Sequence, residues 1–298
     1  MTLVAACIVA YKRDPLLRQA LEAVTNQSRR PSFVFVVDNA GLKSTETLSK
    51  QFGANYLRGE ENFGSAGGFA LAIQESIIRG AKLIWLLDDD GLPGLNCLGE
   101  LIKSIDSLHA DAVSPLSISP LDEGKTSNAF WLGLSKTDNI STMRRKSHRR
   151  NKVQFYNGVL LRKELVEKVG VPNTSLFMRG DEIDYFRRCK RCKMRMYLCT
   201  NAEFSHPSSA GEYGTSRRFP FSVNIPGEDK KRYYQFRNRG YLVRTHFLLH
   251  YFVYDLIRYP LAFIFFRKLD VSGLAAWATT YWEGLRKILK PYNAEKET

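Results

Sequence analysis

Residues 82–90 read KLIWLLDDD: five apolar side chains lead directly into three consecutive aspartates. A continuous apolar run of this length is typical of a parallel strand that is buried on both faces. In open α/β sheets, ligands bind beyond the carboxyl ends of the strands. Asp88, Asp89 and Asp90 therefore stand where such a sheet would place a binding site.

The chain on either side of this run alternates between predicted strands and predicted helices. Apolar runs predict strands over residues 3–10, 33–37, 54–57, 82–87, 112–117, 155–161 and 196–199. Helical spacing predicts helices over residues 15–27, 44–52, 69–79, 98–108, 163–169 and 186–195. This alternation predicts right-handed βαβ units and an α/β fold, with flanking helices on a mixed, mostly parallel sheet.

Two polar segments interrupt this pattern. Residues 121–152 are polar and irregular, which predicts a mobile loop. Residues 203–229 contain Pro and Gly throughout, which predicts a linker to a helical tail at residues 231–289. We therefore expect a main domain over residues 1–215 and a helical, basic and aromatic C-terminal extension over residues 216–298.

The chain is strongly basic. It has 44 Lys and Arg against 30 Asp and Glu, a net charge of +14. Such an excess favours partners that carry phosphate or acidic lipid. The basic run at residues 144–150 makes nucleic-acid binding a remote alternative, but no nucleic-acid-binding motif accompanies it and the acidic clusters would stay unexplained. We expect no nucleic-acid partner.

The sequence also bears on compartment and membrane contact. Five cysteines without a dense pairing pattern favour a reducing compartment, and the N-terminus lacks the pattern of a secretory signal. The segment Phe247–Phe266 is about long enough to span a bilayer, but Asp255 and Arg258 interrupt it. We expect it to lie on a membrane surface. The alternative is a buried helical pair that packs on the main domain.

The three aspartates suggest a cation site. Alternate residues of an extended stretch share a face, so Asp88 and Asp90 can converge on one Mg²⁺ or Mn²⁺ while Asp89 points elsewhere. A solvated acidic turn is the alternative. His206 follows a predicted strand and offers an imidazole nitrogen as a third ligand, although a lone histidine is more often structural.

Two further groups of residues suggest a binding or catalytic role. Asp181, Glu182 and Asp184 fall within four positions at the start of a predicted helix. One of them can act as a general base, whereas compensation of the helix dipole is the plain alternative. A glycine-rich run can bring backbone N–H groups close to a diphosphate, but it lacks the features of a P-loop. Its candidate binding residues are Asn62, Gly64, Gly67 and Gly68.

Taken together, residues 3–210 resemble the family 2 glycosyltransferases with the GT-A fold. The resemblance implies that Tyr11 and Arg13 lie against the base and phosphates of a nucleotide sugar, and that Asp38 lies near the uracil. It implies that Asp88 contributes to the metal-binding motif and to the donor diphosphate site. Within the acidic pair Asp181–Glu182, it assigns the role of catalytic base to the second acid, Glu182.

Within that family, the glycine-rich run, the triple aspartate and the later histidine look most like bacterial galactofuranosyltransferases and rhamnosyltransferases. This likeness implies that His206 joins Asp88 and Asp90 on Mn²⁺ or Mg²⁺. It implies inverting transfer of galactofuranose from UDP-galactofuranose to a cell-surface glycan or lipid-linked acceptor, at the cytoplasmic face of the cell membrane. A rhamnosyltransferase that uses a dTDP-sugar, or a hexopyranosyltransferase, is the alternative. Two positions depart from the pattern: Glu182 replaces the usual aspartate, and Gly180 stands where tryptophan is common.

Overall fold

The computed structural model describes residues 2–207, 213–216 and 223–293, and it divides the chain into two compact units. The first unit comprises Met1–Pro172 and Arg188–Ser208, and the second comprises Asn173–Arg187 and Ser209–Thr298. The domains that we predicted differ from these units chiefly in residues 173–187, which belong to the second unit.

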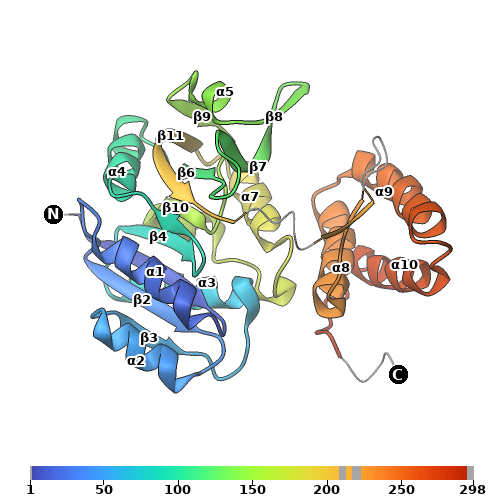
Figure 1. Ribbon diagram of the computed structural model, residues 1–298, viewed down its shortest axis with the longest axis horizontal. Helices are drawn as coiled ribbons and strands as arrows, with labels where there is room; N and C mark the ends of the chain where they lie inside the picture. The colour runs from blue at the N-terminus through green and yellow to red at the C-terminus, as the bar shows by residue number, and fades with distance from the viewer. Residues whose placement is uncertain (1, 208–212, 217–222, 294–298) are drawn as a thin grey trace. The chain divides into compact units, whose positions relative to one another are not determined.

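Within the part of the chain that the structure describes, eleven strands of the first unit form one sheet (Figure 1). Their bounds are β1 (Val4–Ala10), β2 (Phe33–Asp38), β3 (Asn55–Arg58), β4 (Leu83–Asp88), β5 (Leu92–Pro93), β6 (Ala112–Ile118), β7 (Lys125–Leu132), β8 (Ser135–Asn139), β9 (His148–Arg150), β10 (Asn157–Arg162) and β11 (Met196–Ser205). The central order is β3-β2-β1-β4-β10-β6-β11-β5. Only β10 and the short β5 run antiparallel to their neighbours on this path, so the predicted mixed, mostly parallel sheet is confirmed.

Helices cover both faces of this sheet, because β1 is apolar on both sides. Ala6 and Ile8 lie in a buried cluster with residues of α1 and α4. On the opposite face, the thiol of Cys7 contacts the carbonyl oxygen of Ala72 in α3. The helices are α1 (Asp14–Thr25), α2 (Lys43–Gln51), α3 (Gly64–Ile78), α4 (Cys97–Ser107), α5 (Ile140–Arg144), α6 (Lys163–Val169) and α7 (Asp181–Arg191), the last of which continues from the second unit into the first.

The glycine-rich run lies inside α3 and not before it. This helix begins at Gly64, five residues earlier than the helix that we predicted. A β-carbon on Gly68 would lie 2.6 Å from Cγ1 of Val9, so α3 approaches β1 at a distance that only glycine permits. Close packing therefore accounts for a glycine that apolar periodicity alone does not explain.

The prediction of a mobile loop over residues 121–152 was wrong. This segment forms β7, β8, α5 and β9, and β9 pairs antiparallel with β11. Met143 of α5 is fully buried, and the guanidinium of Arg149 donates to the carbonyls of Met143 and Thr142 at 2.9 and 2.7 Å. The strands here mix polar with apolar residues, as in KTSNAFWL of β7 and HRR of β9, so they produce no apolar run for the periodicity to detect.

The second unit is a group of helices with a small β-hairpin. Its elements are η1 (Thr174–Leu176), β12 (Tyr213–Ser216), β13 (Val223–Pro226), α8 (Asp229–Thr245), α9 (Leu249–Leu261), the π-helical turn η3 (Ala262–Phe266) and α10 (Val271–Leu285). The predicted helical tail is thus present. The predicted linker at residues 203–229 was wrong in part: β11 extends to Ser205 and the strands of the hairpin follow it. Residues 208–212 and 217–222 lie outside the described residues.

Two buried polar residues of α8 explain why residues 173–187 belong to the second unit. Arg237 and Asn238 are both fully buried. The amide nitrogen of Asn238 donates to the carbonyls of Leu176, Met178 and Arg179 at 2.7–2.9 Å. These three hydrogen bonds hold in place the backbone that leads into α7.

Candidate active site

Side chains from four strands meet at one edge of the sheet. The strands β1, β2 and β4 are parallel, and Val9 pairs with Asp88 while Ala10 pairs with Asp38. Since β10 is antiparallel to both β4 and β6, and β11 is parallel to β6, β11 ends at this same edge. His206, directly after β11, thereby comes close to Asp88 although the two are far apart in sequence.

The structure brings together all three residues that we predicted as metal ligands. One potential ligand atom from each of Asp88, Asp90 and His206 lies within 4.8 Å of the other two. The Nε2 atom of His206 is 3.3 Å from Oδ1 of Asp90. The Nδ1 atom of His206 is 2.7 Å from the carbonyl oxygen of Pro207, which can only accept a hydrogen bond. The neutral ring therefore presents a lone pair on Nε2, as metal-bound histidines do.

Asp89 points away from this group and is fully buried. Its carboxylate forms an ion pair with the guanidinium of Arg13 and accepts a hydrogen bond from the backbone N–H of Tyr11 at 3.3 Å. Arg13 also contacts Asp90 at 2.7 Å. The sequence analysis assigned no role to Asp89. The structure shows that its contacts hold the loop after β1 against the acidic turn.

The acidic turn carries more negative charge than Arg13 can neutralise. Burial and the neighbouring charge of Asp90 raise the pKa of Asp88 to about 8. Burial also raises the pKa of Asp89 to about 6, against the opposing effect of Arg13. For Asp90, burial is outweighed by His206 and Arg13, which hold its pKa below the usual value. A divalent cation such as Mn²⁺, held by Asp88, Asp90 and His206, would offset the penalty that burial and the charge of Asp90 impose on ionised Asp88.

The residues predicted to bind the nucleotide sugar lie at or near the same strand ends. Asp38 is fully buried, and its carboxylate accepts hydrogen bonds from the N–H groups of Ala40 and Leu42 and from the hydroxyl of Tyr56. The side chain of Asn62 accepts a hydrogen bond from the N–H of Gly64, the first residue of α3, at 2.9 Å. Both side chains thus have structural partners, and their contact with a nucleotide stays a prediction.

Asn39 is a polar residue whose individual role we did not predict. It is 4% exposed, and its amide nitrogen donates to the carbonyl of Gly64 at 2.9 Å. Its amide oxygen is buried and has no hydrogen-bond partner among the described residues. A buried acceptor without a partner is costly, so this oxygen is suited to a donor from a bound ligand. Only its position after β2, a feature shared with many turn residues, could have indicated this.

The acidic residues of α7 lie in the second unit and differ in exposure. Asp181 and Asp184 are each 1% exposed, whereas Glu182 is partly exposed. The Nε2 atom of His246 lies 3.0 Å from Asp184, and both side chains are buried. The carboxylate of Glu182 accepts a hydrogen bond from the N–H of Gly180 at 3.1 Å. Of the three acids, Glu182 is therefore the one that solvent reaches most readily.

Comparison with known sequences identifies the family. Residues 5–170 match the family described as glycosyl transferase family 2. The chain is 31% identical over 283 residues to galactofuranosyltransferase GlfT1 of Mycolicibacterium smegmatis, covering 92% of this chain and 93% of that protein. It is 29% identical over 280 residues to galactofuranosyltransferase GlfT1 of Mycobacterium tuberculosis, covering 91% and 92%.

Solved structures agree on the fold. TarS residues 1–349 of S. aureus match with a TM-score of 0.60 at 10% identity, covering 97% of this chain and 82% of that one. GalNAc-T7 with UDP, GalNAc and Mn²⁺ matches with a TM-score of 0.56 at 13% identity, covering 69% of this chain and 43% of that one. The chain therefore belongs to the family 2 glycosyltransferases, and it is a glycosyltransferase with the GT-A fold.

Proposed function

We propose that the protein transfers galactofuranose from UDP-galactofuranose to a hydroxyl group of a cell-surface glycan or lipid-linked glycan, with inversion at the anomeric carbon. The observation that carries this proposal is the group Asp88, Asp90 and His206 at the sheet edge of a chain related to two galactofuranosyltransferases. A divalent cation held there would supply positive charge to the departing diphosphate.

The donor would bind along the carboxyl ends of β1, β2 and β4. There the buried amide oxygen of Asn39 can accept a hydrogen bond from the nucleotide, and the N-terminus of α3 favours negative charge. Arg13 already neutralises part of the acidic turn and so keeps a diphosphate from meeting three uncompensated carboxylates. Tyr11, which is 41% exposed beside it and has Nζ of Lys12 5.2 Å from its ring centroid, can contact the base.

Glu182 is our candidate for the catalytic base. It would remove the proton from the acceptor hydroxyl as the oxygen attacks the anomeric carbon, so one displacement inverts the configuration. Its partial exposure supports this choice over Asp181 and Asp184, which are buried. We assign Asp181, the first residue of α7, to positioning the start of this helix.

Replacing Glu182 by glutamine tests this assignment. Glutamine keeps a side-chain oxygen that can accept from the N–H of Gly180, so the start of α7 should stay intact. We expect turnover to fall about 10²- to 10⁴-fold with little change in binding of the nucleotide sugar. Glu228→Gln, an exposed glutamate of the same unit, is the matched control. Near-normal turnover of Glu182→Gln would contradict the assignment.

We also propose that the protein works at the cytoplasmic face of a membrane, where a lipid-linked acceptor would be available. Among the described residues, no helix is long and apolar enough to cross a bilayer. The C-terminal helices combine aromatic and basic residues as the interfacial helices of peripheral proteins do.

A further inference from the structure

The second unit has an exposed apolar surface whose side chains are not part of its buried core. Of the nineteen large apolar residues that are exposed in the described part of the chain, eleven lie between Phe247 and Trp282. On α9, Leu249, Val253 and Leu256 follow helical spacing and are 72%, 58% and 48% exposed. Phe265 of η3 is 69% exposed. Soluble proteins rarely leave so many neighbouring apolar side chains in water without a partner.

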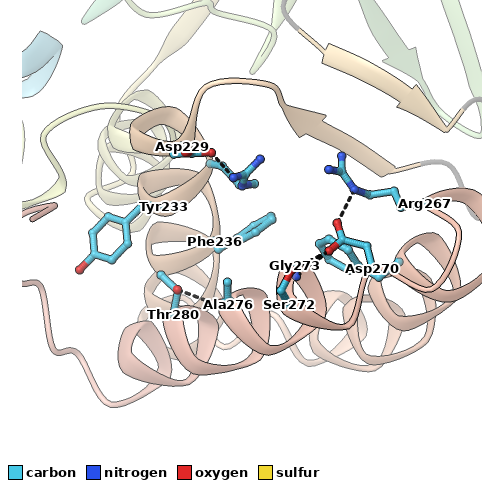
Figure 2. A pocket seen from close by; sticks show the side chains of 11 residues that line it. Asp229, Tyr233, Phe236, Arg267, Asp270, Ser272, Gly273, Ala276 and Thr280 are labelled. Carbon is cyan, nitrogen blue, oxygen red and sulfur yellow. Dashed lines mark hydrogen bonds and ion pairs between the residues drawn. The ribbon is translucent and has the colours of Figure 1, made fainter. Parts of the chain in front are cut away.

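A cavity of about 430 Å³ lies between α8, η3 and α10 of this unit (Figure 2). Phe236 and Phe263, which are almost fully buried, form its apolar wall. Arg232 from α8 and Arg267, the residue after η3, line the same cavity. Figure 2 shows the ring of Phe236 pointing from α8 into the cavity. Arg267 lies across the cavity from this ring. Two arginines thus line one cavity, and one of them, Arg267, directly follows the exposed residues Phe265 and Phe266 in the chain.

Both arginines keep the capacity to bind an anion. Arg232 pairs with Asp229, which lies three residues earlier on the same helix. Because Asp229 is half exposed, this ion pair contributes little to the stability of the fold. Arg267 donates through Nε to Asp270 at 2.8 Å, and its two terminal nitrogens have no hydrogen-bond partner within the described residues. The other oxygen of Asp270 accepts from the N–H of Gly273 and so caps α10.

The charge of the C-terminal part of the unit favours an anionic surface. Residues 223–293 contain twelve Lys and Arg against five Asp and Glu, a net charge of +7. A guanidinium can donate two parallel hydrogen bonds to a phosphate, and basic residues close to a bilayer are attracted to acidic lipids. The apolar residues of α9 and η3 can enter the boundary between headgroups and acyl chains.

We propose that the apolar surface of α9 and η3 docks on a membrane, and that the phosphate of an anionic lipid headgroup lies between Arg232 and Arg267. This inference gives the proposed membrane contact a defined surface and a defined ligand. It does not depend on the identity of the sugar donor, because lipid binding needs no catalysis.

Co-sedimentation of the full chain with vesicles tests the lipid site. The vesicles contain phosphatidylcholine alone or phosphatidylcholine mixed with phosphatidylglycerol. The double variant Arg232→Gln with Arg267→Gln should bind the mixed vesicles at least about tenfold more weakly, since charge-assisted hydrogen bonds are lost. The control pair, Lys287→Gln with Lys290→Gln, removes the same charge outside the cavity. Equal losses in the two pairs would overturn the phosphate site.

Two further arms separate docking from binding of a soluble anion. Phe265→Ser should weaken binding to mixed vesicles about tenfold while leaving the melting temperature unchanged, because this ring is exposed. Millimolar inorganic phosphate should leave the protein on the vesicles. Unchanged binding by Phe265→Ser, or release by inorganic phosphate, would overturn the docking surface. Nucleotide-sugar turnover without vesicles should be the same in all these variants, so a failure of docking is distinguishable from a failure of the proposed catalysis.

Discussion

Asp88→Asn removes the ionisable carboxyl group of Asp88 while keeping a side chain of nearly the same shape. The pKa of Asp88 is raised to about 8, so the metal-free folded protein holds a proton there that the unfolded chain releases near pH 4. Between these values the folded state binds more protons, and its free energy of unfolding falls as the pH rises. The slope approaches about 1.4 kcal/mol per pH unit between the two pKa values, where folded and unfolded states differ by about one bound proton.

Asparagine has no proton to lose, so the variant should lack this contribution. Without metal, Asp88→Asn should be more stable than the unsubstituted protein at about pH 8, and the difference should shrink as the pH falls toward about 4. Mn²⁺ should stabilise the unsubstituted protein at pH 8 but not the variant. Because the cation competes with the proton, its dissociation constant should rise about tenfold for each unit of pH below 8.

Urea denaturation across this pH range, with and without Mn²⁺, measures the stability, and calorimetric titration measures the affinity for the cation. Asp122→Asn, at an exposed loop position, controls for the loss of one charge. The reasoning is refuted if the two proteins lose stability in parallel from pH 5 to pH 8, or if Mn²⁺ stabilises both equally.

Three other substitutions test the fold and the site by the same denaturation experiment. Gly284→Ala should cost about 2 kcal/mol or more, because its β-carbon would lie 1.8 Å from the carbonyl oxygen of Arg237; an unchanged stability would show that α8 and α10 pack less closely. Asn238→Ala should cost about 2–3 kcal/mol, because three carbonyls before α7 lose their donor; a cost below about 0.5 kcal/mol would contradict this. Arg13→Gln should cost about 1–3 kcal/mol at pH 8 and less at pH 5, where Asp89 can take a proton; a cost that does not depend on pH would argue against the pairing.

The central sheet was predictable because its strands carry their own signal. The apolar runs that became β1, β2 and β4 are buried on both faces, so sequence alone located them to within a residue or two. The acidic turn followed from the end of β4, and alternation along an extended backbone separated Asp89 from its neighbours. Each of these features depends on residues that are neighbours in the sequence, so a local sequence pattern was enough to predict it.

The remaining features depend on contacts between distant residues. Arg13 meets Asp89 only because β1 and β4 are neighbours in the sheet, and nothing near Arg13 in sequence indicates that pairing. Residues 173–187 were placed with the main domain because no local signal shows that Asn238 would bind their backbone. The strands after residue 121 contain mostly polar residues or mix them with apolar ones, so periodicity could not distinguish them from a loop.

We propose that this glycosyltransferase uses UDP-galactofuranose and a divalent cation. The most direct measurement is release of nucleotide diphosphate in Mn²⁺ from a panel that contains UDP-galactofuranose, UDP-galactopyranose, UDP-glucose and dTDP-rhamnose. We predict preferential release of UDP from UDP-galactofuranose, lost with chelator and lost in Asp88→Asn. Faster release from dTDP-rhamnose or a hexopyranosyl donor, or full activity in chelator, would contradict the claim.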